Sequence, residues 1–524
     1  MCDVLVYAAT AAGVCAAVAA AETGADVTLL EPGQHVGGMV SGGLGYSDVG
    51  DLRVLGGMAA RFRADVAEHY GVPVGAYAGP EPHVAEAIFR RWLEQAGVDV
   101  VFGAPLLDPV AGVARVGQGT DEQGAPRLEW VEAAGTRYAA AAFVDASYEG
   151  DLLAAAGVPY AVGREDTSLY GESLAGRQEI LPGMHVMPVG ISPFAGDPSG
   201  RTEGPLLPQI KPEPLARVGA GDGGVMSYGY RVCLSRDAHR IPFTPSPSWN
   251  ADRWELGRRL FDHWRRTGTA VVAGRLLGLE PNLPGDKCDG NSLGPFSLSV
   301  HDGSAWRYPD AGLAEREAIR IAHLHHAQDY LWFLATDPAV PADVRAEITR
   351  WGLPSDEFAD TGHLPHQLYV REARRMHGAQ TLTQHDLTSP LPRADTVAMG
   401  SYHIDIREVQ RAWRWAYEHP DPVAHVVTEG YLSVRVPPYQ IPYGCLTPRY
   451  EDCANLLVPV CLSASHVAFS SVRMEPQYQM LGQAAGVAAA LAAHAEQPVQ
   501  RVDVGRLQHL LTENGQVLGL PSSP

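Results

Sequence analysis

Three small residues near the N-terminus have the spacing of a dinucleotide-binding turn. Such a turn joins a strand to a helix and lets the backbone approach a diphosphate at the helix N-terminus. The three positions hold Ala8, Thr10 and Gly13, and Glu31 follows Gly13 by 18 residues, where an acid would accept ribose hydroxyls. Two of the usual glycines are missing, but alanine adds only a methyl and the Thr10 hydroxyl could donate to a phosphate. The pattern favours nucleotide binding over a plain βαβ turn.

A second glycine pattern matches the fingerprint more literally, at Gly219, Gly221 and Gly224. It joins a proline-containing loop to an expected strand over residues 225–232 and opens no helix. A diphosphate needs the helix N-terminus, so we reject this match as a phosphate site. The chain therefore has one nucleotide fingerprint, and no separate NAD(P)-binding domain is expected.

The elements around the first fingerprint form the expected frame for it. Residues 3–7 predict a strand, 14–23 an alanine-rich helix ended by Gly24, and 25–31 a second strand. Further along, we expect a helix over 84–96 ended by Gly97 and strands over 98–102, 127–131 and 136–144. We also expect a long helix over 313–334, a buried strand over 455–462 and a helix over 477–494.

The loop after Glu31 is rich in glycine. Glycines stand at positions 37, 38, 42, 43 and 45. A simple crossover does not need so many, whereas the ribityl-phosphate arm and ring of a flavin must lie against bare backbone. The loop therefore narrows the nucleotide to a flavin.

Composition and charge exclude several classes of partner. The net charge is −20 and the pI is about 5.4, so clustered basic residues for nucleic acid are not expected. The seven cysteines form no C-x-x-C pair, which favours a reducing cytoplasm. The apolar run over residues 4–21 has no basic residue before it, so it predicts neither a signal peptide nor a membrane span. His323, His325 and His326 lack a completing carboxylate, and no metal site is expected.

The predicted fold class is α/β. At 524 residues the chain exceeds the size of one core. We expect a Rossmann-like FAD-binding domain built from both chain ends, residues 1–165 and 401–524. An inserted α+β substrate domain is expected over residues 166–400.

Several segments resemble the bacterial FAD-dependent oxidoreductase family, whose flavin domain is related to fumarate-reductase-type flavoproteins. Some members of the family carry a xanthan-lyase label. The segments are EPGQHVGGMVSGGLG at 31–45, FVDASYEGDL at 143–152, PHQLYVREARRM at 365–376, YQIPYGCL at 439–446 and the block at 457–486. Ala8 departs from the glycine that is general in the family.

The resemblance implies FAD as the cofactor and a set of contacts with it. We expect FAD to be bound non-covalently, although the sequence itself leaves covalent attachment open. The ADP half would lie at the fingerprint and Glu31, the diphosphate and flavin edge at the glycine loop, the adenine at the backbone of Val101, and the ribityl chain near residues 146–149. The C-terminal block would lie against the flavin, with the N-terminus of the last helix directed at the ring, where reduction builds negative charge. The expected cofactor-binding residues are Ala8, Thr10, Ala11, Ala12, Gly13, Glu31, Gly37, Gly38, Met39, Ser41, Gly42, Gly43, Val101, Ala146, Ser147, Glu149, Ser463, Ser465, Gln479, Met480 and Gln483.

Candidate catalytic residues lie in the C-terminal third. To oxidise an alcohol or amine, a flavoenzyme takes hydride at N5 while a base takes a proton. His466 is the leading base, with a histidine bonded to backbone as the alternative. Arg473 could bind a carboxylate, unless it forms an ion pair with Glu475, and we expect Glu475 to cap the last helix. Tyr402, His403 and Tyr439 could line the substrate cavity or fill the core.

The sequence thus predicts an FAD-dependent dehydrogenase or oxidase. Its substrate would be small and polar, such as a sugar-like or natural-product alcohol or amine. A flavin monooxygenase and a flavin-fold binding protein without catalysis are the alternatives. A small-molecule substrate is expected, with no nucleic-acid or membrane partner, and homo-oligomer formation is left open. The charged segment from Arg371 to Arg375 is expected to be a helical turn whose charges pair locally.

Overall fold

A mixed seven-stranded sheet carries the N-terminal part of the chain. The computed structural model describes the whole chain except residues 1, 107–113, 182, 184, 418–420 and 522–524. The strand order is β3-β2-β1-β6-β5-β4, with β17 paired to β6. The pairs β1–β2, β2–β3, β1–β6 and β6–β17 are parallel, and β4–β5–β6 is an antiparallel extension. The strands are β1 (Cys2–Tyr7), β2 (Val27–Glu31), β3 (Asp99–Phe102), β4 (Arg115–Thr120), β5 (Pro126–Ala133), β6 (Thr136–Asp145) and β17 (Leu456–Leu457).

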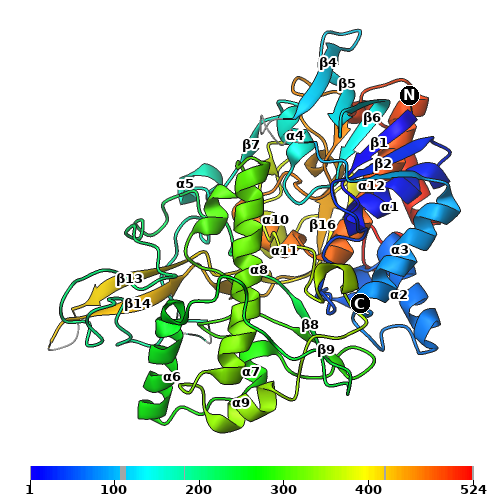
Figure 1. The fold of residues 1–524 in the computed structure, drawn as a ribbon. Helices are drawn as coiled ribbons and strands as arrows, with labels where there is room; N and C mark the ends of the chain where they lie inside the picture. Colours follow the sequence, from blue (N-terminus) through cyan, green and yellow to red (C-terminus); the bar gives the residue numbers. More distant parts are fainter. Residues whose placement is uncertain (1, 107–113, 182, 184, 418–420, 522–524) are drawn as a thin grey trace.

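The two ends of the chain pack against each other. Figure 1 shows the N-terminal segment in blue beside the C-terminal helix in red. A Cβ on Gly482 would lie 2.2 Å from the carbonyl oxygen of Ala12, and one on Gly486 would lie 2.1 Å from that of Ala16. These two glycines therefore let the helix backbones touch. The helices around the sheet are α1 (Ala11–Glu22), α2 (Gly57–Tyr70), α3 (Pro82–Ala96), α11 (His466–Val472), α12 (Glu475–His494) and α13 (Val504–Glu513).

The middle of the chain is built from helices and small two-stranded sheets. Its longest helix, α8 (Leu313–Thr336), runs through the green region of Figure 1. The other helices are α4 (Asp151–Ala155), α5 (Thr167–Tyr170), α6 (Glu255–Thr267), α7 (Gly274–Leu277), α9 (Ala342–Ile348) and α10 (Gln384–Thr388). The strand pairs are β7 (Tyr160–Ala161) with β10 (Arg375–Met376), β8 (Val232–Ser235) with β9 (Lys287–Gly290), β11 (Thr396–Gly400) with β16 (Tyr439–Pro442), β12 (Ile404–Ile406) with β15 (Leu432–Val434), and β13 (Gln410–Ala416) with β14 (Val423–Glu429). Short 3₁₀ turns lie at η1 (Leu52–Val54), η2 (Ala251–Trp254), η3 (Ser304–Arg307), η4 (Ala359–Thr361), η5 (Tyr443–Cys445) and η6 (Val499–Arg501).

Three local predictions need correction. The strand expected over 455–462 is only Leu456–Leu457, because Pro459 has no amide to continue the ladder. The strand expected over 225–232 begins only at Val232, and Gly229 makes isolated bridges to two different segments instead. The segment from Arg371 to Arg374 is not helical, and its charges are buried. The domain limits at residues 165 and 400 stay a prediction.

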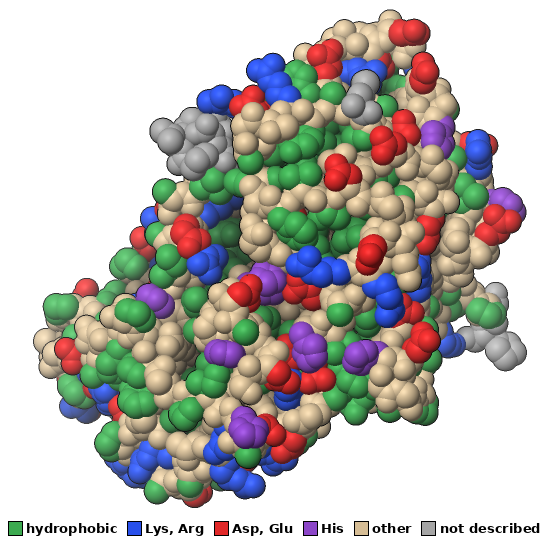
Figure 2. Space-filling model, turned by 45° about the vertical axis from the view of Figure 1, so that its right-hand side comes forward, with side chains coloured by type: hydrophobic (Ala, Val, Ile, Leu, Met, Phe, Trp, Pro, Cys, Tyr) green, Lys and Arg blue, Asp and Glu red, His purple; other side chains and the backbone are tan. Residues whose placement is uncertain are grey.

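The outer surface mixes charges of both signs. On the face drawn in Figure 2, basic side chains are interspersed with acidic ones and histidines. No helix among the residues described is both long and apolar enough to cross a bilayer. All seven cysteines are free thiols.

Candidate functional site

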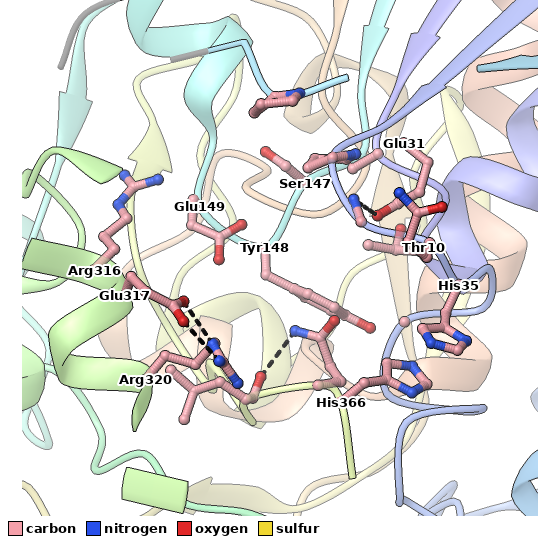
Figure 3. Close-up of a pocket in the computed structure, with 18 of the residues that line it drawn as sticks. Thr10, Glu31, His35, Ser147, Tyr148, Glu149, Arg316, Glu317, Arg320 and His366 are labelled. Atoms are coloured by element: carbon pink, nitrogen blue, oxygen red, sulfur yellow. Dashed lines mark hydrogen bonds and ion pairs between the residues drawn. The ribbon is translucent and has the colours of Figure 1, made fainter. Parts of the chain in front are cut away.

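A cavity of about 740 Å³ opens at the carboxyl ends of β1, β2 and β6. The chain leaves β1 towards β2 on one side, whereas β6 flanks the other side of β1. Such a switch point is where open parallel sheets bind ligands, and the volume lies within the range of small-molecule and cofactor sites. Figure 3 shows the lining, which includes Thr10, Glu31, His35, Ser147, Tyr148, Glu149, Arg316, Glu317, Arg320 and His366.

The N-terminus of α1 meets this cavity at Thr10. The Thr10 hydroxyl caps α1 by accepting from the amide of Gly13 at 3.1 Å, and it donates to the carbonyl oxygen of Ala146 at 2.7 Å. Its proton is therefore used within the protein, so the predicted donation to a phosphate is wrong. The amides of Ala11 and Ala12 have no acceptor among the described residues. Those two amides and the helix dipole suit an anion.

The turn before α1 depends on Gly13. A Cβ on Gly13 would lie 1.9 Å from the carbonyl oxygen of Ala8, so no larger residue fits without movement. Ala8 has φ +69°, in the left-handed region that favours glycine. The fingerprint geometry is thus kept with alanine at its first position, at some cost in backbone strain.

Replacing Ala8 with glycine is expected to stabilise the protein. Removing the Cβ relieves left-handed strain of about 1 kcal/mol. The matched control is Ala21→Gly within α1, which should destabilise by about 0.5–1 kcal/mol because glycine is a poor helix former. Denaturant unfolding measures both changes, and the same sign for the two variants would contradict the prediction.

Glu31 ends β2 and faces the cavity. Its carboxylate accepts from the amide of Ala9 at 2.7 Å and from that of Gly33 at 2.6 Å. Burial raises the pKa of Glu31 to about 7, although these two amides act in the opposite direction. An acceptor placed here, next to the N-terminus of α1, suits ribose hydroxyls.

The glycine loop serves mainly to pack protein against protein. The space beside Gly37 is filled by Phe89, that beside Gly38 by Tyr148, and that beside Gly42 by Gln367. Of the glycines at positions 37, 38, 42, 43 and 45, only Gly38 lines the cavity. Close approach of neighbouring segments explains these glycines without a flavin, and the predicted contact of the loop with the flavin stays a prediction.

The segment after β6 forms the floor of the cavity. The Ser147 hydroxyl donates to Asp145 at 2.7 Å, and Tyr308 donates to Glu149 at 3.1 Å. Burial raises the pKa of Glu149. The Tyr148 hydroxyl accepts from the amide of Met39 at 2.9 Å. Ser147 and Glu149 both line the cavity, as predicted for residues beside a cofactor, but their role in binding stays a prediction.

Helix α8 supplies a wall that the sequence reasoning missed. Leu313, Arg316, Glu317, Arg320 and Leu324 line the cavity from this helix. Their spacing of 3, 4, 7 and 11 residues is that of one helical face, which is the signal that could have found them. Arg316 pairs with Asp151 at 2.8 Å, so the helix is joined to the floor.

The other predicted cofactor-binding residues do not line the cavity, although Ala11 and Ala12, with their unpartnered amides, directly follow Thr10, which does. Ser463 contacts the amide of Gly378, and Ser465 caps α11. Gln483 accepts from the amide of Met58. None of the following lines the cavity: Ala11, Ala12, Gly13, Gly37, Met39, Ser41, Gly42, Gly43, Val101, Ala146, Ser463, Ser465, Gln479, Met480 and Gln483. Tyr7 and Pro105 line the cavity whereas Val101 does not, and its contact with the adenine stays a prediction.

His466 is held in a buried charge network. Its Nδ1 lies 2.8 and 2.9 Å from the two carboxylate oxygens of Glu372, and its amide donates to Glu165 at 2.9 Å. Arg375 contacts both of these glutamates. The Nε2 of His466 is enclosed and has no partner among the described residues. The ring is thus oriented by a carboxylate, but His466 does not line the cavity, so its role as general base stays a prediction.

Three predicted catalytic residues gather in a second cluster. Arg473 contacts the carboxylate of Asp405 at 3.1 Å and Tyr369 at 3.1 Å. His403 lies 3.8 Å from Asp405, and its ring centroid lies 4.0 Å from that of Tyr402. Burial opposes ionisation of Asp405, but His403, Arg407 and Arg473 together lower its pKa to about 2. Arg473 therefore pairs with Asp405, and not with Glu475.

Tyr439 reaches this cluster through a serine. The hydroxyls of Tyr439 and Ser471 are 2.7 Å apart, and Ser471 donates to the carbonyl oxygen of Tyr402 at 2.5 Å. Tyr439 is buried, and it acts on the cluster only through this chain. A catalytic role for it stays a prediction.

Glu475 was expected to cap α12, but it does not. It is the first residue of the helix, makes no capping bond, and accepts from the Tyr148 hydroxyl at 2.7 Å. Burial raises its pKa to about 8, while the Tyr148 hydroxyl acts in the opposite direction. Glu475 is therefore protonated at neutral pH.

Glu475 should make the protein less stable as the pH rises. Between the ordinary carboxyl pKa near 4.5 and about 8, the folded state holds a proton that the unfolded state has released. We expect the free energy of unfolding of the wild type to fall, relative to Glu475→Gln, by on the order of 3 kcal/mol from pH 4.5 to pH 8. Denaturant titrations at several pH values test this, with Glu129→Gln on the surface as control. Parallel curves for the wild type and Glu475→Gln would contradict it.

One group of possible metal ligands is present in the described part of the chain. Ligand atoms of Glu81, His83 and Glu357 lie within 4.8 Å of one another. The ammonium of Lys287 sits 2.5 Å from Glu81 and 2.9 Å from Glu357. Because the lysine already neutralises these carboxylates, the cluster is an ion-pair network.

Comparisons with known proteins give one family and several partial structural matches. A family model described as FAD dependent oxidoreductase matches residues 3–511. No curated protein matches the chain. Solved structures that match include THI4 of Thermovibrio ammonificans, thioredoxin reductase of T. acidophilum and a flavin monooxygenase of Stenotrophomonas maltophilia.

These structural matches are partial. For THI4 the identity is 17% and the TM-score 0.24, with 31% of this chain and 66% of the other covered. For thioredoxin reductase the identity is 18% and the TM-score 0.16, with 28% of this chain and 34% of the other covered. For the monooxygenase the identity is 16% and the TM-score 0.18, with 28% of this chain and 37% of the other covered. The chain therefore spans less than two thirds of the length of each.

Proposed function

Because the chain belongs to the family of FAD-dependent oxidoreductases, it is an enzyme that uses FAD, and we propose that it is a dehydrogenase or oxidase of a small polar substrate. Such a substrate would be a sugar-like or natural-product alcohol or amine. The observation that carries the proposal is the cavity at the switch point of the sheet, with the N-terminus of α1 and Glu31 on its wall.

The residues of the cavity fit FAD. The free amides of Ala11 and Ala12 would hold the diphosphate, and Glu31 would accept from the adenosine ribose. The close contact of Gly13 with Ala8 keeps this turn tight. Bound FAD would accept the hydride that leaves the substrate carbon.

The chain itself must remove the substrate's O–H or N–H proton. We assign this step to His466, whose Nε2 has no partner in the described part of the chain. Its Nδ1 is fixed by Glu372, so the proton would be taken at Nε2 and the resulting cation would be stabilised by the carboxylate. The charge network around Glu372 thus supports an acid–base role.

Absorption spectroscopy of the purified protein tests the proposal. The flavin spectrum is expected, and acid precipitation should release it into the supernatant because the cofactor is bound non-covalently. Under anaerobic conditions, the flavin bands should bleach with one class of a panel of sugar-like alcohols, hydroxy acids and amines. No NAD(P)H should be needed for this bleaching.

The outcomes separate the alternatives. Bleaching that occurs only with NAD(P)H, followed by oxygen insertion into the added compound, would indicate a monooxygenase and overturn the proposal. A flavin that no member of the panel bleaches would also count against it.

A further inference from the structure

Arg371 is a buried guanidinium without a carboxylate partner. Its exposed fraction is 4%, and it donates through Nη1 to the carbonyl oxygen of Ser227. Its guanidinium carbon lies 4.4 Å from the centroid of the Tyr369 ring. Within the described ranges, no Asp or Glu oxygen lies within 4.0 Å of it. Burial accordingly lowers the pKa of Arg371 to about 9.

The neighbouring charges do not compensate Arg371. Arg407 is paired with Glu408 at 3.4 Å, and Arg473 with Asp405 at 3.1 Å. Both arginines lie close enough to Arg371 to act on its pKa in the same direction as burial. Glu408 acts on the pKa of Arg371 in the opposite direction, but it is paired with Arg407, so neither of the two carboxylates pairs directly with Arg371.

A second buried arginine shows what a purely structural role looks like. Arg411 donates to the carbonyl oxygens of Gln209 and Pro295 and contacts His301, and its remaining Nε is enclosed. Arg371 makes one such bond. Its Nε and Nη2 have no partner in the described structure, and, unlike the Nε of Arg411, they are not enclosed. One edge of the Arg371 guanidinium is therefore open.

Arg371 lies close to the wall of the cofactor cavity without lining it. Leu368 lines the cavity and is followed directly by Tyr369, on which Arg371 stacks. Tyr148 also lines the cavity, and its ring centroid lies 6.4 Å from that of Tyr478 beside Arg473. His403, with 30% of its side chain exposed, gives the cluster contact with solvent.

We propose that Arg371 binds a carboxylate group of the substrate. The inference rests on the proposed oxidase or dehydrogenase function and narrows its substrate to a carboxylate-bearing alcohol or amine. A guanidinium edge matches a carboxylate with two parallel N–H···O bonds, and binding would supply the negative charge that the site lacks. A single negative charge fits better than a phosphate dianion, because Asp405 and Glu408 lie in the same cluster.

The test uses acetate as the smallest carboxylate probe and acetamide as its neutral counterpart. Both are titrated into the FAD-loaded enzyme by calorimetry at constant ionic strength, and Tm is followed in parallel. The variants are Arg371→Met, Arg371→Lys and the surface control Arg217→Met, whose side chain is 81% exposed. FAD content is measured for each variant.

Acetate, and not acetamide, should bind the wild type and raise its Tm. Arg371→Met should raise the acetate Kd at least about tenfold, and Arg371→Lys less, because lysine lacks the planar fork. Without acetate, Arg371→Met should melt no lower than the wild type, since an unpaired buried charge is removed. Arg217→Met should bind acetate like the wild type.

Several results would overturn the site. The site would be contradicted if the wild type and Arg371→Met bound acetate equally, or if the wild type did not respond to acetate. If Arg371→Met does not fold, Arg371→Lys decides, because an unchanged acetate Kd in that variant contradicts a bidentate site. The experiment stands apart from turnover: acetate binding through Arg371 without flavin bleaching by any substrate would defeat the proposed function and leave the site intact.

Discussion

Gly13→Ala is expected to reduce FAD binding by on the order of 100-fold. A Cβ at this position would lie 1.9 Å from the carbonyl oxygen of Ala8, so the turn or the start of α1 must move. Overpacking of this kind costs about 1–3 kcal/mol, and the displaced Ala11 and Ala12 amides would no longer converge on the diphosphate. Fluorescence titration of the apoprotein with FAD measures the loss.

Gly274→Ala is the matched control. Gly274 is also helical, and a Cβ there would meet nothing within 4 Å. This variant should bind FAD like the wild type and be slightly more stable, because alanine is the better helix former. Near-normal FAD affinity in Gly13→Ala would show that the N-terminus of α1 is not where the diphosphate binds.

Glu31→Ala is expected to weaken FAD binding by about 1.5–3 kcal/mol, or roughly ten- to 150-fold. The carboxylate at the end of β2 is the acceptor placed for the adenosine ribose. It also accepts from the amides of Ala9 and Gly33, so some loss of apoprotein stability should accompany the change. Glu31→Gln keeps an acceptor and should lose less affinity than Glu31→Ala.

The control for this prediction is Glu129→Ala, at an exposed position of β5. Its FAD Kd should equal that of the wild type. Affinity measured against both FAD and riboflavin separates the two halves of the cofactor, because riboflavin lacks the adenosine. A similar loss of affinity for both ligands in Glu31→Ala would contradict contact with the ribose.

The frame of the fold follows from local sequence patterns. The βαβ unit, the helix ended by Gly97 and the long α8 are predicted because apolar periodicity and capping residues are short-range signals. The strand prediction over 455–462 was too long. The apolar run there is continuous, but Pro459 ends the pairing after two residues. Apolar runs predict burial more directly than they predict hydrogen-bonded pairing.

The site is less accessible from sequence, because it depends on contacts between distant segments. The fingerprint and Glu31 could be found from spacing along one βαβ unit. By contrast, Arg371 was expected in a helical turn whose charges pair locally, and only the fold shows that it is buried near Arg407 and Arg473 without a carboxylate partner of its own. The sequence also could not show that side chains from distant parts of the chain, such as Gln367, fill the space beside the glycines of the loop.

The position of FAD in crystals of the loaded enzyme tests the central claim most directly. We expect density for the diphosphate at the amides of Ala11 and Ala12, with the adenosine ribose at Glu31 and the rest of the cofactor in the cavity faced by α8. Density for FAD elsewhere, such as in the groove between α6 and residues 190–198, would contradict it.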